Sequence, residues 1–135
     1  MLDDLGLLPA IEWQAQEFRK HAGVKCEVVS SIDTAEPAPE QSIAIFRIVQ
    51  EALTNIARHA AATKVDISLH DESGWLILEV RDDGKGIGAN EIAGKESIGL
   101  LGMRERALAV GGELTIKGFR GKGTVVTLRI PFPAR

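Results

Sequence analysis

The sequence has a single cysteine, Cys26, few aromatic residues (4%) and no tyrosine. One cysteine cannot form an internal disulfide and is too few for a thiolate metal site. No apolar run approaches the ~20 residues that a membrane-spanning helix needs. The acidic start MLDD is unlike a signal peptide. These absences predict a cytoplasmic protein with an aliphatic core and no direct contact with a membrane.

The chain also lacks a large excess of charge of either sign. The formal net charge is −3, and the charged residues, 26% of the chain, are mixed in sign along it. The sequence therefore has no basic patch of the kind that binds nucleic acid, and we expect no nucleic-acid partner. At 135 residues the chain fits one domain. A domain of this size buries roughly two thirds of the surface of its unfolded chain and can hold a core without disulfides or bound metals.

The hydrophobic pattern divides the chain into helices and strands. Helical spacing of apolar residues predicts helices at residues 5–22, 41–60 and 100–110. Short apolar or alternating runs predict strands at residues 25–30, 64–70, 75–80, 113–117 and 124–130. A turn at residues 71–74 predicts an antiparallel hairpin, and the glycine-rich residues 81–98 predict a mobile loop. The expected fold is α+β: a two-layer α/β sandwich whose mixed, mostly antiparallel sheet is covered on one face by three helices.

The stretch FRIVQEALTNIARHA, residues 46–60, carries two stripes. One stripe is apolar and faces a core. The other is polar: Glu51, Asn55 and then Arg58 or His59 follow one another at helical spacing, so a carboxylate, an amide and a basic group project from one side. Exposed polar residues on a helix usually carry no function, so this stripe alone is weak evidence for a site.

Three glycine-rich segments follow this helix in order. They are DDGKGI (residues 82–87), GLLGMRERA (residues 99–107) and GKGT (residues 121–124). With the helix, these segments resemble the N, G1, G2 and G3 boxes of the ATP-binding fold shared by sensor histidine kinases, DNA gyrase, Hsp90 and MutL. The resemblance implies that the chain binds ATP and Mg²⁺. A P-loop is excluded because Gly123 interrupts the required Gly-Lys-Ser/Thr, and the glycines do not give the G-x-G-x-x-G of a Rossmann site.

The polar stripe offers the groups that a magnesium nucleotide needs. Asn55 can present its amide oxygen to a hard cation that keeps several waters and shares the phosphates. Glu51, one turn earlier, can orient or deprotonate an attacking group near that metal. Arg58 or His59 can meet a phosphate oxygen. The family resemblance implies these same roles: Asn55 as magnesium ligand, Glu51 as the activating residue, and a basic residue near the helix end for phosphate.

The first glycine box has the pattern D-x-G-x-G. Asp82 can accept the exocyclic amine of adenine, Gly84 and Gly86 leave room for a base against the backbone, and Ile87 completes the box. The alternative is an ordinary hairpin turn, because Asp-Gly is a common turn pair. Asp83 competes with Asp82 for the role of base acceptor, and the spacing favours Asp82.

The second and third boxes are expected to hold phosphate and base. Gly99, Leu100 and Gly102 stand at the predicted start of a helix, where free N–H groups and the helix dipole favour phosphate. Residues 87–98 would form a short lid over the nucleotide. In the third box, the resemblance implies that the Thr124 hydroxyl lies near the adenine and its aspartate. A plain strand-entry turn is the alternative there.

The run GLLGMRERALAVGGELTI and the opening LDDLGLLPAIEW resemble sensor histidine kinases of the nitrate-sensor type, whose regulators are often DNA-binding response regulators. The resemblance implies a catalytic domain spanning residues 1–135, with residues 1–6 as the remnant of a link from a dimerisation domain that carries the phosphorylated histidine. His21, His59 and His70 do not lie in a segment like the phosphoacceptor helix. We therefore expect a monomeric fragment of a homodimeric parent. The fragment would bind ATP without phosphorylating itself and would reach a response regulator only through the dimerisation domain.

Two other functions remain open. One is a free-standing serine kinase of the anti-sigma-factor type, against which the MRER run and the LDDLGLL opening argue. The other is a non-enzymatic, nucleotide-gated interaction module, against which the intact Glu51 and Asn55 argue. DNA gyrase and MutL carry large transducer regions, for which a chain of 135 residues has no room. The parent kinase is expected to present this domain to the cytoplasm even where other segments anchor it in a membrane.

Overall fold

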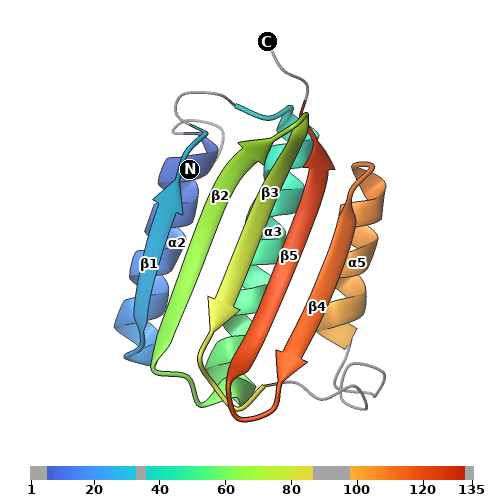
Figure 1. Cartoon of the computed structure of the whole chain (residues 1–135). Helices are drawn as coiled ribbons and strands as arrows, with labels where there is room; N and C mark the ends of the chain where they lie inside the picture. The colour runs from blue at the N-terminus through green and yellow to red at the C-terminus, as the bar shows by residue number, and fades with distance from the viewer. Residues whose placement is uncertain (1–5, 33–35, 87–97, 133–135) are drawn as a thin grey trace.

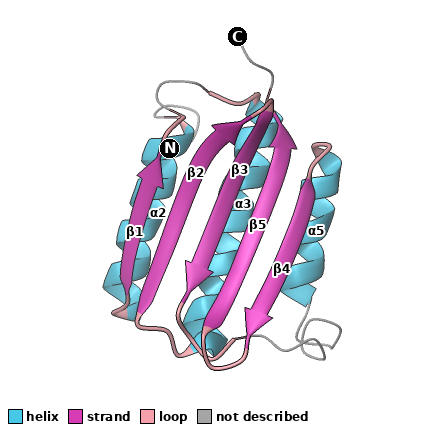
Figure 2. Ribbon diagram, in the orientation of Figure 1, coloured by secondary structure: helices cyan, strands magenta, loops and turns pink. Residues whose placement is uncertain are grey.

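Alternating apolar residues give the β-sheet one buried face, and helices cover that face (Figure 1, Figure 2). The computed structural model describes residues 6–32, 36–86 and 98–132. In these ranges the strands are β1 (Lys25–Ser30), β2 (Lys64–Glu72), β3 (Trp75–Asp82), β4 (Glu113–Phe119) and β5 (Gly123–Pro131). Their order in the sheet is β1-β2-β3-β5-β4. Only β1 and β2 pair in parallel, so the sheet is mixed and mostly antiparallel, as predicted.

The covering layer contains α2 (Leu7–Ala22), α3 (Pro39–Asn55) and α5 (Ile98–Ala109). A π-helical turn, η1 (Ile56–Ala60), continues α3. Figure 1 shows all of these helices behind the sheet, with α3 across its middle. The predicted two-layer α+β sandwich is therefore confirmed. Within the described ranges, no helix is long and apolar enough to cross a membrane.

The core lies between the two layers and is aliphatic. The helices contribute the fully buried Leu7 and Ile11 from α2, Ile45, Ile48 and Leu53 from α3, and Met103 from α5. The sheet contributes alternate residues such as Ile67, Leu78 and Leu128. Each such side chain stabilises the fold by about 1.5–3 kcal/mol through its removal from water. This shared core fixes α3 and α5 against the same face of the sheet.

Helix starts differ slightly from the prediction. α2 begins at Leu7, not at residue 5, after Gly6 with φ 89°. Glu36 accepts the Leu7 N–H at 3.2 Å from a loop 29 residues away. α3 begins at Pro39, not at Gln41, because proline is well suited to the first turn. The Gln41 side chain instead caps the helix start by accepting the Ala38 N–H at 3.1 Å.

Strand ends also extend beyond the predicted limits. The hairpin between β2 and β3 has a two-residue turn, Ser73 and Gly74, in place of the four-residue turn 71–74. Both residues have positive φ, 50° and 86°, which matches the twist of a tight hairpin. β3 continues through Arg81 and Asp82, which were assigned to the loop, because both pair with β5.

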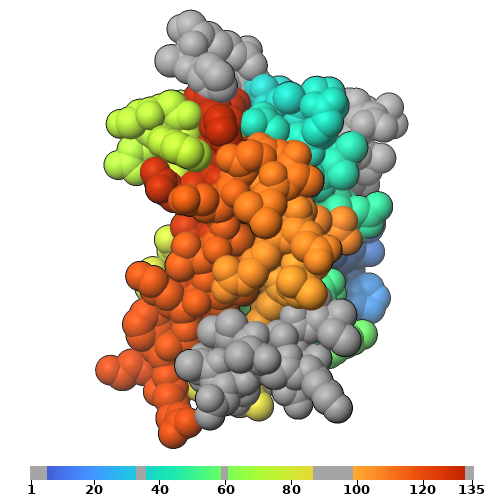
Figure 3. Space-filling model, turned by 90° about the vertical axis from the view of Figure 1, so that its right-hand side faces the viewer, coloured from blue at the N-terminus to red at the C-terminus, as the bar shows by residue number. Residues whose placement is uncertain are grey.

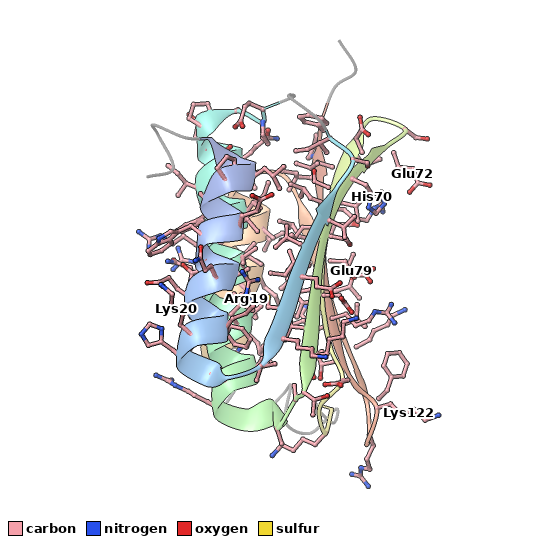
Figure 4. The ribbon with its side chains drawn as sticks, turned by 90° about the vertical axis from the view of Figure 1, so that its left-hand side faces the viewer. Arg19, Lys20, His70, Glu72, Glu79 and Lys122 are labelled. Atoms are coloured by element: carbon pink, nitrogen blue, oxygen red, sulfur yellow. The ribbon has the colours of Figure 1, made fainter. Side chains whose placement is uncertain are left out.

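An arginine from the helical layer meets each edge strand. Arg19 of α2 donates from Nη1 to the Cys26 carbonyl of β1 at 2.6 Å, and Figure 4 shows its side chain between helix and sheet. The N–H groups of Lys25 and Ser31 donate to the carbonyls of Thr63 and Leu69, so these N–H groups point toward β2. Because neighbouring residues of a strand point in opposite directions, the Cys26 carbonyl faces the free edge. On the other side, where α5 and β4 lie side by side (Figure 3), Arg104 donates to the Leu114 carbonyl at 3.1 Å.

Candidate functional site

The segments that carry the predicted nucleotide contacts converge at one end of the fold, the lower end in Figure 1. There α3 ends in η1, β3 ends at Asp82, β5 begins at Gly123 and α5 begins at Ile98. Gly123 and Gly86 lie close to the backbones of Asp82 and Phe119, and Gly99 lies against the Glu51 side chain of α3. Residues more than 40 positions apart in sequence are thus brought into one region.

Asp82 is a buried carboxylate at the end of β3. Its side chain is only 5% exposed, and its strand partner Thr124 is equally buried. Asp82 Oδ1 accepts the Gly84 N–H at 2.8 Å. Burial raises the pKa of Asp82 above its ordinary value, and hydrogen bonds from the Gly84 and Thr124 backbones partly oppose that rise. A carboxylate held in this way is a strong acceptor facing the helical layer.

Asp83 has the opposite environment. Its carboxylate is exposed and accepts the N–H groups of Thr63 at 2.7 Å and Lys64 at 3.0 Å. It also accepts the Thr63 hydroxyl at 2.5 Å. The Thr63 hydroxyl, followed by the two backbone donors, lowers the pKa of Asp83 to about 2. Of the two aspartates, only Asp82 is buried, and its role as the base acceptor stays a prediction. Nothing in the sequence had indicated the partners of Asp83.

The glycines of the first and third boxes pack against each other's backbones. Gly123 has φ 110°, and a Cβ there would overlap the Asp82 carbonyl oxygen. Gly86 has φ 81°, and a Cβ there would overlap the Phe119 carbonyl oxygen. Gly84 is buried. Gly86 and Gly123 need glycine for close backbone approach, whether or not a ligand is present.

Glu51 and Asn55 of α3 lie against the first turn of α5. A Cβ on Gly99 would overlap the Glu51 carboxylate and lie 3.5 Å from Asn55 Oδ1. The helix begins at Ile98, not at the predicted residue 100, so Gly99 falls in its first turn and Gly102 in its second. Among the described residues, a Cβ on Gly102 would meet no atom within 4 Å. A side chain at position 99 would therefore displace the end of Glu51, whereas a Cβ at position 102 would displace no described residue.

Other predicted contacts have mixed outcomes. The regular helical spacing predicted from Glu51 to His59 is wrong beyond Asn55, because the wider π-helical turn changes the direction of the side chains. Arg58 is exposed on that turn. Leu100 is 5% exposed and packs in the core, which leaves only its backbone for a ligand. The His59 side chain, Ile87 and the predicted lid up to residue 97 lie outside the described residues.

The donor set fits a magnesium ion shared with a ligand. In the described ranges, no group of three or more His, Cys, Asp or Glu side chains could hold a metal ion. Magnesium commonly keeps its waters and takes only one or two protein oxygens together with substrate phosphates. Asn55 Oδ1, beside Glu51 and the first turn of α5, is a suitable protein ligand for that arrangement.

A separate groove of about 720 Å³ lies between α2 and the end of α3. Its lining includes Trp13, Phe18, His21 and Leu53. From the helix end the groove is lined by Gln50, Leu53, Thr54, Ile56 and Ala57. Glu51 and Asn55 are not among its lining residues.

Known proteins match this chain over the segments that form the candidate site. The family model described as histidine kinase-, DNA gyrase B- and HSP90-like ATPase matches residues 40–134. The chain is 36% identical over 131 residues to the signal transduction histidine-protein kinase/phosphatase DegS of Brevibacillus brevis, covering 96% of this chain and 33% of that protein. It is 30% identical over 135 residues to DegS of Bacillus subtilis (strain 168), covering 96% and 35%. It thus spans about a third of the length of these relatives.

Solved structures give the same grouping. The histidine kinase domain from Erythrobacter litoralis EL346 blue-light activated histidine kinase superposes with a TM-score of 0.74 at 26% identity, covering 91% of this chain and 61% of that chain. Histidine kinase AdeS of Acinetobacter baumannii, at 19% identity, shares the fold with a TM-score of 0.73, covering 93% and 63%. With the family model matching more than half of its residues, the chain belongs to the histidine kinase-, DNA gyrase B- and HSP90-like ATPase family.

Proposed function

We propose that this chain is the ATP- and Mg²⁺-binding catalytic domain of a two-component sensor histidine kinase. ATP bound with Mg²⁺ supplies the γ-phosphoryl group, and the acceptor is a histidine on a dimerisation domain of the parent protein. The observation that carries the proposal is the buried Asp82 carboxylate, paired with Thr124 and closed in by Gly123. The names of the relatives, all histidine kinases, support the reaction class.

Base recognition is assigned to the end of β3. Asp82 accepts the exocyclic amine of adenine. A buried carboxylate is costly without hydrogen-bond donors, so an N–H donor from a ligand stabilises it. The Thr124 hydroxyl, the backbone at Gly84 and Gly86, and Ile87 complete the base subsite. An acceptor at this position selects adenine over guanine, whose corresponding edge carries a carbonyl oxygen.

Phosphate and metal binding are assigned to the two helices. Asn55 holds the metal through its amide oxygen, and Glu51 orients or deprotonates the attacking group. Arg58 or His59 pairs with a phosphate oxygen. The free N–H groups of the first turn of α5, at Gly99 and Leu100, together with the open backbone at Gly102, receive phosphate oxygens.

The partners follow from the same assignment. We propose that residues 1–6 belong to the link from the dimerisation domain, that the isolated chain is a cytoplasmic monomer, and that the parent is a homodimer feeding a response regulator. The run from Gly99 to Arg106 supports the narrower class of nitrate-sensor-like kinases. The isolated chain is not expected to phosphorylate itself.

Calorimetric titration of ATP with and without Mg²⁺ tests the nucleotide assignment. The native chain should bind. Asp82→Ala should abolish binding, and Asn55→Ala should mainly remove the dependence on Mg²⁺. Asp71→Ala, an exposed aspartate at the far end of β2, should bind like the native chain and serves as the control. A native chain that binds no ATP would favour the interaction-module function.

Phosphotransfer tests the reaction. The chain, mixed with ATP, Mg²⁺ and a dimerisation domain from a related kinase, should label that domain on histidine, and Glu51→Gln should reduce the rate by roughly 100-fold or more. Phosphohistidine formed on the chain alone would defeat the fragment assignment. Labelling of an added serine protein in place of the histidine domain would support the serine-kinase alternative.

A further inference from the structure

Asp83 fastens two separate parts of the chain. Its carboxylate accepts three hydrogen bonds from Thr63 and Lys64, and its own N–H donates to the Lys64 carbonyl at 3.3 Å. Asp83 directly follows β3, and Lys64 is the first residue of β2. Few exposed side chains in the described ranges make three hydrogen bonds to a two-residue segment. The contact is therefore more than a local turn of the Asp-Gly pair.

The Thr63–Lys64 segment is where the chain leaves α3 and its π-helical turn η1. It follows η1 after Ala61, a non-glycine residue in the left-handed region with φ 51°. Such a conformation persists only where the surrounding structure holds it. The Thr63 carbonyl also accepts the Lys25 N–H at 3.3 Å, so the same segment anchors the start of β1. A displacement of this segment would move the turn that carries Arg58.

We propose that Asp83 is a positioning residue that holds the exit of α3 and η1 at a fixed place relative to the base-binding end of β3. It thereby sets ATP affinity without touching ATP. One side of the contact carries Asp82, assigned to the base, and the other follows Arg58 and His59, assigned to phosphate. This inference rests on the proposed function, because only a ligand that spans both subsites senses their separation.

A ligand comparison separates this role from a general structural one. ATP reaches both subsites, whereas adenosine reaches only the base subsite. Asp83→Ala removes all three accepted hydrogen bonds and should weaken ATP binding by roughly tenfold or more, with adenosine binding changed by less than about twofold. Asp82→Ala should weaken both ligands. Loss of folding stability alone would weaken both ligands to the same extent.

Conservative variants sharpen the test. In Asp83→Asn, the remaining carbonyl oxygen can accept both N–H groups and the new amide can donate to the Thr63 hydroxyl. ATP affinity should stay within about threefold of native. Thr63→Val removes only the hydroxyl contact and should fall between Asn and Ala. Asp71→Ala, exposed at the far end of β2, is the matched control and should change neither ligand.

The experiment is titration of ATP-Mg²⁺ and of adenosine into each variant, with amide hydrogen exchange at residues 63 and 64. Faster exchange there in Asp83→Ala and a loss confined to ATP are the expected results. Equal affinities for native and Asp83→Ala, or equal losses for both ligands, would overturn the inference while the proposed function stands. If Asp83→Ala does not fold, the same comparison is decided by Thr63→Val. A native chain that binds no ATP would overturn both proposals.

Discussion

Two adjacent aspartates have pKa values shifted in opposite directions, because one is buried and the other accepts several hydrogen bonds. Burial raises the pKa of Asp82, while the Thr63 and Lys64 donors lower that of Asp83 to about 2. The two side chains therefore contribute to stability with opposite dependence on pH. Each dependence can be measured in a variant that keeps the shape of the side chain.

Asp82→Asn should separate stability from binding. Because the folded pKa of Asp82 lies above the unfolded value, its contribution to stability is fully present at low pH and is lost as pH rises through the folded pKa. A neutral amide removes that loss, so the melting temperature at pH 7 should match or exceed that of the native chain. ATP affinity should fall roughly tenfold or more, since the acceptor is no longer charged. A lower melting temperature would contradict this account.

Asp83→Asn should make the free energy of unfolding fall less steeply as the pH is lowered. The folded pKa of Asp83, about 2, lies below its ordinary value of 3.8, so its contribution is present above pH 3.8 and is lost as pH falls through 2. Urea unfolding between pH 5 and pH 2 should therefore show a steeper decline for the native chain than for the variant. Parallel curves would mean that Asp83 does not contribute.

At the scale of elements, α5 contains two glycines in different surroundings. Gly99 packs against the Glu51 side chain of α3, whereas no atom of the described residues lies within 4 Å of a Cβ built on Gly102. Both belong to one sequence box, and both would be read from sequence alone as phosphate-binding glycines. The structure supplies a packing reason for the first and none for the second.

Alanine substitutions should distinguish these two glycines. Gly102→Ala should stabilise the free chain by about 0.5–1 kcal/mol, because alanine is the better helix former. Gly99→Ala should gain less stability than that, because the new methyl group displaces the end of the Glu51 side chain. Urea unfolding measures both effects, and each variant is the control for the other. If Gly102 also receives phosphate, its variant will bind ATP more weakly despite being more stable.

Patterns within a single segment predicted the elements, and partners far along the chain decided their ends. The apolar alternation of β2 and β3 was sufficient to identify the hairpin. Arg81 and Asp82 extend β3 only because they pair with β5, more than 40 residues later. The π-helical turn after Asn55 has no signature in residue spacing. The partners of Asp83 likewise depend on where the exit of α3 comes to lie, which no local pattern encodes.

At the scale of the whole molecule, the sheet has one covered face and one open face. Figure 4 shows His70, Glu72 and Glu79 on the side away from the helices. Arg129 on the same face stacks over the Trp75 ring, 4.7 Å from its centroid. The predicted nucleotide contacts instead gather at one end of the covered layer. Nucleotide binding can therefore alter the ends of α3 and α5 without disturbing the open face.

The edge arginines Arg19 and Arg104 should affect how molecules associate. Arg19→Ala and Arg104→Ala each expose a strand carbonyl and remove a charge-assisted hydrogen bond. Each is expected to cost about 1 kcal/mol in a urea unfolding experiment, less than the roughly 1.5–3 kcal/mol typical of hydrogen bonds to charged groups, because both contacts are only partly buried. Sedimentation at high protein concentration should show more self-association of the double variant than of the native chain. Lysine in place of arginine keeps the charge and is the control.

These two arginines also limit the growth of the sheet. A free strand edge is a template on which another chain can add a strand, and such additions lead to domain swapping and fibrils. Here a guanidinium already occupies a carbonyl on each edge, so an incoming strand must first displace it. We therefore expect strand exchange between copies of the five-stranded sheet to be slower than it would be without these two hydrogen bonds.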